Sequence, residues 1–302
     1  MKKFVQALIL VCVILSSTFI FSGCSRESYE YADADKYSYG GTTLNIESVK
    51  NVSIDWVEGI VKLEYNANAR GITIEEQCET NLGQDEQVAY YFDGETLFIK
   101  YRKSTDRKVK MKKEKYLTIS FPSQLSISED IVCNMNNANL IVNGFKLSSI
   151  NSVSYDGSVD VYNCFVSTGN SIVTYGGDVN LRNSTFADLS VDSKEGGIYT
   201  DKLSCYNLDV NTVSGGCVFN CDYLTNSNIN VFSNNGDVTF IFNEKNIEEF
   251  SLKYVTMIGF LDSEFPLEEG EDLTYNYNLQ TNHPPFISVE TIGGRLYIKK
   301  SN

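Results

Sequence analysis

Residues 150–240 repeat a short pattern in which apolar and polar side chains alternate on both sides of a glycine. The segments 153–161 (VSYDGSVDV) and 173–181 (VTYGGDVNL) match almost position by position. Alternation with a period of two is typical of half-buried β-strands. Because no stretch of this region has a 3.6-residue apolar stripe, we predict short strands joined by tight corners rather than by helices.

The glycines that mark the pattern recur with spacings of 20, 19, 20 and 20 residues. Each begins a Gly-x-aliphatic unit or its close equivalent; these repeat-turn positions are Gly157, Gly177, Gly196, Gly216 and Gly236. A constant period predicts a chain that winds once per repeat and stacks each coil on the next. We therefore expect an all-β, single-stranded β-solenoid, similar to a parallel β-helix, with about 20 residues per coil. A β-sandwich is the alternative, but it would not require so constant a spacing.

A glycine at a fixed place in each coil supplies either a backbone conformation or a clearance that a side chain would obstruct. The same rhythm, with weaker registration, continues into residues 52–63 and 287–298. The solenoid domain is accordingly predicted over residues 44–302. Residues 243–285 have an irregular pattern that includes Pro284-Pro285, and we predict a cap or a side loop there.

The chain begins with a basic Met-Lys-Lys, followed by a largely apolar run that ends in Phe-Ser-Gly before Cys24. This arrangement is typical of an export signal, and its end resembles the bacterial lipobox. We predict a lipoprotein signal peptide over residues 1–23, a lipid on Cys24 and a flexible lipid-anchored tether over residues 24–43. Two acyl chains suffice for stable membrane anchoring. An uncleaved membrane-spanning anchor and an ordinary secretory signal are the alternatives.

Composition narrows the range of functions. Asp and Glu number 39 against 25 Lys and Arg, for a net charge of −14. This acidity argues against a nucleic-acid partner, whose phosphates would need neutralising. The single histidine, His283, excludes a site built from two or more imidazoles. Because no G-x-S-x-G elbow accompanies it, we interpret His283 as structural.

Taken together, these features resemble the putative adhesin family of bacterial β-strand-repeat proteins. The resemblance rests on the lipobox, the early strand-Gly-strand unit, the strand at 117–122, the Gly-x-Val repeats and the closing segment 289–294. It implies a right-handed solenoid on an exported protein, often from Gram-positive bacteria. The family carries no catalytic residues, so we predict no catalytic residue, no cofactor and no metal.

Residues 100–115 (KYRKSTDRKVKMKKEK) form the sharpest local charge feature on this acidic chain. One interpretation is an arm that contacts anionic headgroups or wall polymers. The other is a solvated hairpin loop neutralised by the protein's own acids. The candidate contact residues are Lys100, Arg102, Lys103, Arg107, Lys108, Lys110, Lys112, Lys113 and Lys115.

Two groups of acidic residues are candidates for chemistry. Residues 262–272 hold six carboxylates but lack the spacing of a calcium-binding loop, which favours a solvated loop. The repeat acids Asp156, Asp178 and Asp237 lie near corners. Paired carboxylates cleave polysaccharides on other β-helices, but turn formation explains these acids as well.

Six cysteines follow Cys24: Cys78, Cys133, Cys164, Cys205, Cys217 and Cys221. In an exported protein they are compatible with disulfides, with small buried hydrophobes or, least favoured, with a metal site. The 19 Tyr and 17 Phe exceed what strand interiors need, and exposed members could serve as carbohydrate platforms. Which way they face is not decided by the sequence.

The favoured function is a non-catalytic surface lipoprotein that is held by its lipid and works through contact with a partner. The expected partners are the membrane, through the N-terminal lipid, and a wall glycan, a host glycoprotein or another envelope protein. A polysaccharide-active β-helix enzyme and an accessory protein in envelope-stress signalling are the alternatives.

Overall fold

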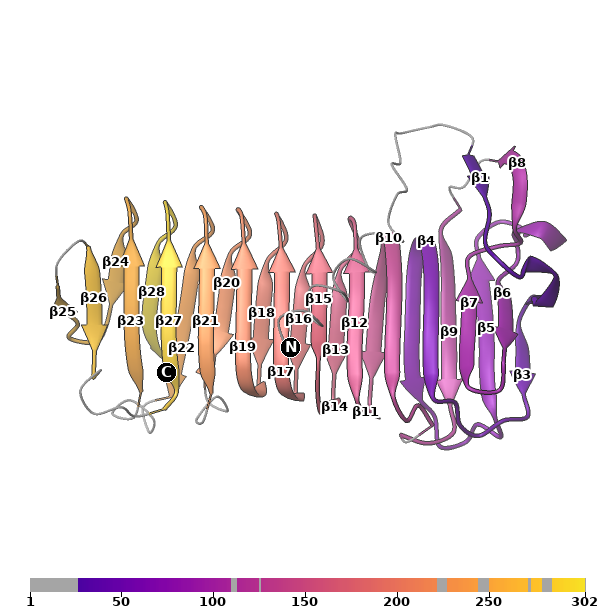
Figure 1. Ribbon diagram of the computed structural model, residues 1–302, viewed down its shortest axis with the longest axis horizontal. Helices are drawn as coiled ribbons and strands as arrows, with labels where there is room; N and C mark the ends of the chain where they lie inside the picture. Colours follow the sequence, from indigo (N-terminus) through magenta and orange to yellow (C-terminus); the bar gives the residue numbers. More distant parts are fainter. Residues whose placement is uncertain are drawn as a thin grey trace, which may run out of the picture. The chain divides into compact units, whose positions relative to one another are not determined.

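Short parallel strands, stacked coil upon coil, make up most of the structure, which is a computed structural model (Figure 1). It describes residues 27–109, 113–124, 126–221, 227–243, 250–270, 273–278 and 284–301. The chain divides into two units. The smaller contains the antiparallel pair of β1 (Glu27–Tyr29) and β8 (Thr105–Val109). The larger, which comprises Ala32–Lys103 and Lys112–Asn302, carries the repeats.

Two long ladders of parallel strands run through the larger unit (Figure 1). The first, in spatial order, is β7 (Thr96–Lys100), β4 (Asn51–Tyr65), β10 (Asp130–Asn143), β12 (Ser149–Ser154), β15 (Asn170–Thr174), β17 (Thr185–Ser193), β19 (Ser204–Thr212), β21 (Asn228–Ser233), β27 (Phe286–Thr291) and β23 (Ser251–Thr256).

The second ladder uses the other strand of each coil. It begins with β9 (Lys115–Phe121), passes through the second halves of β4 and β10, and continues with β13 (Val159–Tyr162), β16 (Val179–Arg182), β18 (Ile198–Asp201), β20 (Cys217–Asn220), β22 (Val238–Asn243), β28 (Leu296–Ser301) and β24 (Leu261–Ser263). A short third ladder joins β11 (Lys146–Leu147), β14 (Phe165–Val166) and the starts of β17 and β19.

Register along the second ladder follows the sequence repeat. Val159 pairs with Val179, Val179 with Ile198, Ile198 with Cys217, and Cys217 with Val238. All five side chains are buried and point into the coil. Each buried aliphatic side chain of this size contributes about 1.5–3 kcal/mol. The all-β repeat architecture predicted from the alternation is therefore confirmed.

The stacking order departs from the chain order at both ends of the ladders. β27 lies between β21 and β23, and β28 lies between β22 and β24. The last coil of the sequence is thus inserted between two coils that precede it. At the other end β4 lies between β7 and β10 in the first ladder and between β9 and β10 in the second, so that Val52 pairs with Ile131.

Antiparallel strands flank both ends of the larger unit. At one end β5 (Ile72–Cys78) pairs with β9 and β3 (Thr42–Leu44) with β5, while β6 (Ala89–Phe92) pairs with β7 and β2 (Ser38–Tyr39) with β6. At the other end β26 (Thr274–Tyr277) pairs with β23, and β25 (Glu268–Glu269) with β26. Such strands occupy backbone groups that would otherwise form an open edge.

The predicted tether over residues 24–43 is wrong in its second half. β2 and β3 are paired strands of the larger unit, and Tyr37 beside them is buried. Strands of two and three residues are too short to show a periodic pattern, so they could not be predicted from the sequence. Between them and β1 lies the 3₁₀ helix Ala34–Lys36; a second one covers Gln84–Glu86.

The coil interior beyond β22 is closed by aromatic rings. Phe242 stacks on Phe250 with ring centres 4.2 Å apart, and Phe250 stacks on Tyr277 at 4.6 Å. Phe265 contacts the same rings edge-on. Over the described part of the chain, no helix is long and apolar enough to cross a membrane.

Candidate recognition surface

Glycines form a column where the chain passes between the two ladders. A Cβ atom on Gly157 would lie 1.9 Å from the carbonyl oxygen of Ala138, and one on Gly177 would lie 2.1 Å from that of Gly157. Gly196 and Gly236 lie in the same column, because a Cβ atom on either would lie 2.0 Å from a carbonyl oxygen of the preceding coil. None of these residues has a positive φ, so the reason for glycine is the close approach of backbones.

The fourth member of the column is Gly215, and the prediction of Gly216 is wrong. A Cβ atom on Gly215 would lie 1.9 Å from the carbonyl oxygen of Gly196, whereas one on Gly216 would find its nearest neighbour, the carbonyl oxygen of Asp237, at 3.5 Å. The sequence Gly215-Gly216-Cys217-Val218 fits the repeat in two registers. Only the pairing of Ile198 with Cys217 decides between them.

A buried hydroxyl group stands three residues before each glycine of the column, and the sequence reasoning missed it. Ser193 Oγ donates to the carbonyl oxygen of Gly196 at 2.6 Å, and Thr212 Oγ1 to that of Gly215 at 2.9 Å. The same donation occurs from Ser154, Ser233 and Thr291. The signal was present as a recurring Ser/Thr-x-x-Gly motif, which also occurs at Thr174 and Thr256.

This regular stacking places outward side chains of successive coils beside one another. At the third ladder, Phe165 pairs with Thr185 and Thr185 with Ser204. Two residues later along each strand stand Ser167, Ala187 and Tyr206. Inward residues Val166, Phe186 and Cys205 separate the two outward rows and are buried.

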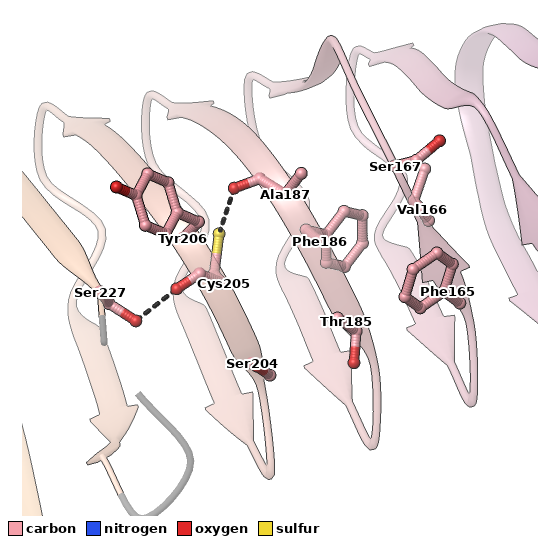
Figure 2. Close-up of a pocket in the computed structure, with 10 residues that line it drawn as sticks. All are labelled: Phe165, Val166, Ser167, Thr185, Phe186, Ala187, Ser204, Cys205, Tyr206 and Ser227. Atoms are coloured by element: carbon pink, nitrogen blue, oxygen red, sulfur yellow. Dashed lines mark hydrogen bonds between the residues drawn. The ribbon is translucent and has the colours of Figure 1, made fainter. Parts of the chain in front are cut away.

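An open trough of about 350 Å³ lies over these two rows (Figure 2). Its lining residues are Phe165, Val166, Ser167, Thr185, Phe186, Ala187, Ser204, Cys205, Tyr206 and Ser227. Phe165 is 52 % exposed and Tyr206 is 61 % exposed. Phe165 lies at the start of the first outward row, and Tyr206 lies at the end of the second row, two coils away. Between them the floor is formed by four small outward residues, Ser167, Thr185, Ala187 and Ser204.

The trough offers groups that the protein itself does not use. Among the described residues, the structure gives no ring partner to Phe165 or Tyr206 and no hydrogen-bond partner to the hydroxyls of Thr185 and Ser204. The exposed pair Tyr155 and Tyr175 differs, because their rings stack on each other with centres 5.0 Å apart. Each of these tyrosines covers part of the other's ring face.

Among the described residues, none that lines the trough carries a charged side chain. Its one thiol, Cys205, lies beneath the floor; burial raises the pKa of this thiol to about 12, so it stays neutral. Ser227 Oγ donates to the carbonyl oxygen of Cys205 and holds the edge of the trough (Figure 2). The surface is therefore suited to a neutral ligand.

A second hollow of about 340 Å³ lies near the end of the second ladder. It is lined by Phe260, Asp262, Arg295 and Tyr297. Phe260 is 72 % exposed, and the neighbouring Ile258 is 74 % exposed. Only four residues line this hollow, and they include one acidic and one basic side chain. Because ten residues line the trough, the trough encloses a ligand better and is the principal candidate.

The predicted basic contact segment is divided by the structure. Lys115 is 1 % exposed and Arg102 is 6 % exposed, so the prediction of an anionic-surface contact is wrong for these two residues. Lys115 Nζ donates to Glu76 Oε1 at 2.9 Å and also to the carbonyl oxygens of Glu86 and Tyr101. Burial lowers the pKa of Lys115.

Acidic neighbours neutralise other members of the segment. Lys100 forms an ion pair with Asp55, Lys103 with Asp85 at 3.1 Å, and Lys113 with Glu86 at 2.8 Å. Arg107 and Lys108 belong to the smaller unit. Lys110 and Lys112 lie outside the described residues.

Two of the three repeat acids accept hydrogen bonds from the backbone of a neighbouring coil. Asp178 Oδ1 accepts the backbone N–H of Gly197 at 2.7 Å, and Asp237 Oδ1 accepts that of Arg295 at 2.9 Å. Asn139 does the same for Ser158. Asp178, Asp237 and Asn139 thus each link one coil to the next. Within the described ranges no three His, Cys, Asp or Glu residues converge into a metal-binding group.

The six cysteines after Cys24 are free thiols in the structure. Cys133, Cys164, Cys205, Cys217 and Cys221 are buried, and Cys78 is half-buried. Burial raises the pKa of Cys217 to about 12. Cys24, the predicted lipid site, and His283 lie outside the described residues, as do Glu271 and Asp272 of the acidic run.

Residues 49–291 match the Toastrack DUF4097 family. The chain belongs to this family, in agreement with the resemblance to putative adhesins drawn from the sequence. No curated protein matches the chain.

Solved structures that the chain matches at low identity come from several bacteria. A putative adhesin from Bacteroides fragilis is 14 % identical with a TM-score of 0.47, and the match covers 88 % of this chain and 97 % of that one. A putative cell adhesion protein from Clostridium sporogenes is 12 % identical, with a TM-score of 0.27 and coverage of 88 % and 100 %. A putative lipid binding protein from Parabacteroides distasonis is 11 % identical, with a TM-score of 0.43 and coverage of 88 % and 97 %. At these values the similarities carry no argument about function.

Proposed function

We propose that this protein is a non-catalytic lipoprotein of the extracytoplasmic membrane face that recognises a partner through its solenoid surface. The trough between Phe165 and Tyr206 carries this proposal, because exposed aromatic rings without intramolecular partners are typical of recognition sites. The repeat acids, which accept backbone N–H groups, support a non-catalytic role over a carboxylate enzyme.

The proposal includes the architecture that presents this surface. We infer a right-handed solenoid of about 20 residues per coil. Register offsets of 20, 19, 19 and 21 residues between paired strands support this coil length. In this proposal the lipid is attached to Cys24, and residues 1–23 are removed as the signal peptide.

The anchoring part is tested by metabolic labelling with palmitate. Wild-type chain and the Cys12→Ala variant are expected to incorporate the label, and Cys24→Ala is expected to lose it. Absence of label from the wild-type chain would contradict lipid anchoring.

The recognition part is tested with the full chain in detergent, by sedimentation with isolated cell-wall sacculi and by binding to immobilised mucin. Replacing Phe165 and Tyr206 together by Ser is expected to abolish binding to at least one of these surfaces. The matched control replaces Tyr155 and Tyr175 by Ser, because these two residues are also aromatic and exposed but lie outside the trough. Equal binding by both double variants would contradict the proposed surface.

A further inference from the structure

The trough over β14, β17 and β19 has dimensions set by the solenoid itself. Phe165 and Tyr206 belong to coils two steps apart, because Phe165 pairs with Thr185 and Thr185 with Ser204. With about 4.8 Å between neighbouring strands, the two rings are separated by about 10 Å along the coil axis. The residues between them, Thr185, Ala187 and Ser204, are small and leave that space open.

The groups that face this space define the chemistry of an occupant. Two aromatic faces pack against apolar ring surfaces, while the hydroxyls of Thr185 and Ser204 have no partner among the described residues and can donate or accept hydrogen bonds. The described residues that line the trough carry no charge. These groups favour an occupant that is neutral and that combines apolar faces with hydroxyl groups.

We infer that the trough binds a neutral pyranose oligosaccharide, with sugar rings packed against Phe165 and Tyr206 and sugar hydroxyls bonded to Thr185 and Ser204. A pyranose combines apolar C–H faces with a rim of hydroxyls, which matches this alternation. The volume of about 350 Å³ lies at the lower end of ordinary ligand sites, which suits one or two sugar units. This inference rests on the recognition role proposed above and names the class of ligand.

Calorimetry on the full chain in detergent micelles tests the inference. The probes are cellotetraose, maltotetraose, mannotetraose and tri-N-acetylchitotriose, with tetragalacturonate as the charged comparison. At least one neutral probe is expected to bind saturably and more tightly than tetragalacturonate. No saturable binding of any neutral probe, or tighter binding of the charged one, overturns the inference.

Two kinds of variant locate the binding. The Phe165→Ser/Tyr206→Ser pair is expected to weaken it by about tenfold or more, whereas Tyr155→Ser/Tyr175→Ser changes it by less than about twofold. Ala187→Trp keeps both aromatic walls and fills the floor, so it is expected to block binding as well. Far-ultraviolet circular dichroism verifies that each variant keeps its β-structure. Sugar binding that survives both trough variants overturns the inference.

The result also separates this inference from the proposed function. If the chain binds sacculi or mucin through the trough but binds none of the neutral sugars, only the ligand class is wrong. If neither the surfaces nor the sugars bind, both proposals are wrong.

Discussion

The carbonyl oxygen of Gly196 lies 1.9 Å from the point that a Cβ atom on Gly215 would occupy. The same close approach occurs between successive coils along the column, from the pair Ala138 and Gly157 to the pair Gly236 and Gly294. Because the obstructing atom is backbone in every case, it cannot turn aside as the end of a flexible side chain can. The glycine column therefore determines how closely successive coils stack.

Gly215→Ala is expected to lower the free energy of unfolding by about 3 kcal/mol or more, since overpacking against backbone forces neighbouring coils apart. Chemical denaturation followed by circular dichroism measures the change. Gly216→Ala is the matched control: its Cβ has no neighbour closer than 3.5 Å, so a change of less than about 0.5 kcal/mol is expected. A larger loss for Gly216→Ala than for Gly215→Ala would refute the assigned register.

Thr212→Val tests the hydroxyl column. The substitution keeps the shape of the side chain but removes the donor to the carbonyl oxygen of Gly215, and we expect a loss of about 1–2 kcal/mol in the free energy of unfolding. Thr239→Val, on the outward side of β22, is the control and is expected to be nearly neutral. Equal effects from the two variants would show that the buried hydrogen bond adds nothing to stability.

Asp160 gives a pH dependence with a definite sign. Burial raises the pKa of its carboxyl group above the ordinary value of 3.8, although Asn180 Nδ2 donates to it at 2.7 Å. Between pH 3.8 and the raised pKa of the folded state, the folded state holds a proton that the unfolded state has lost, so stability falls as pH rises through this window. Asp160→Asn is expected to remove this fall and to be more stable than the wild type at pH 7.

Thermal unfolding between pH 3.5 and 7 measures this difference. Asp192→Asn, an exposed acid on the first ladder with a side chain 41 % exposed, is the control and should retain the fall. A wild-type profile that rises through this window relative to Asp160→Asn would contradict the prediction.

The buried thiols are expected to be unreactive in the native state. With a pKa of about 12, the thiols of Cys205 and Cys217 are about one part in ten thousand thiolate at pH 8. In the full chain carrying Cys12→Ser and Cys24→Ser, a chromogenic disulfide reagent should label Cys78 rapidly and the other five slowly. All six should react after denaturation, and a count below six would reveal a disulfide.

Local repetition made much of the fold predictable from sequence. The alternation around Gly157 and Gly177 predicted strands and their repeat, because side chains on a strand point to opposite faces with a period of two. The shorter strands β2 and β3 were not predictable, since two or three residues cannot show a period. Their positions are determined by pairing with β6 and β5.

Charge along the sequence was a poorer guide than repetition. Lys115 and Lys103 belong to one basic run, yet Lys115 is buried beside Glu76 and Lys103 is paired with Asp85 near solvent. The positions of lysines along the sequence do not predict which acidic side chains strand pairing will place beside them. The trough could not be predicted from the sequence for a similar reason. Phe165 and Tyr206 are 41 positions apart, and only the stacking of coils places them on one surface.

By itself the sequence determined that the protein is an all-β repeat, because alternation with a period of two and glycines at a nearly constant spacing can both be recognised along the chain. It also determined the family to which the chain belongs. The tertiary structure alone decided that Gly215 rather than Gly216 stands in the column, that the last coil is inserted between β21 and β23, and which aromatic rings face outward. The physical reason is that hydrogen-bond register between distant strands, and not local pattern, determines which side chains become neighbours.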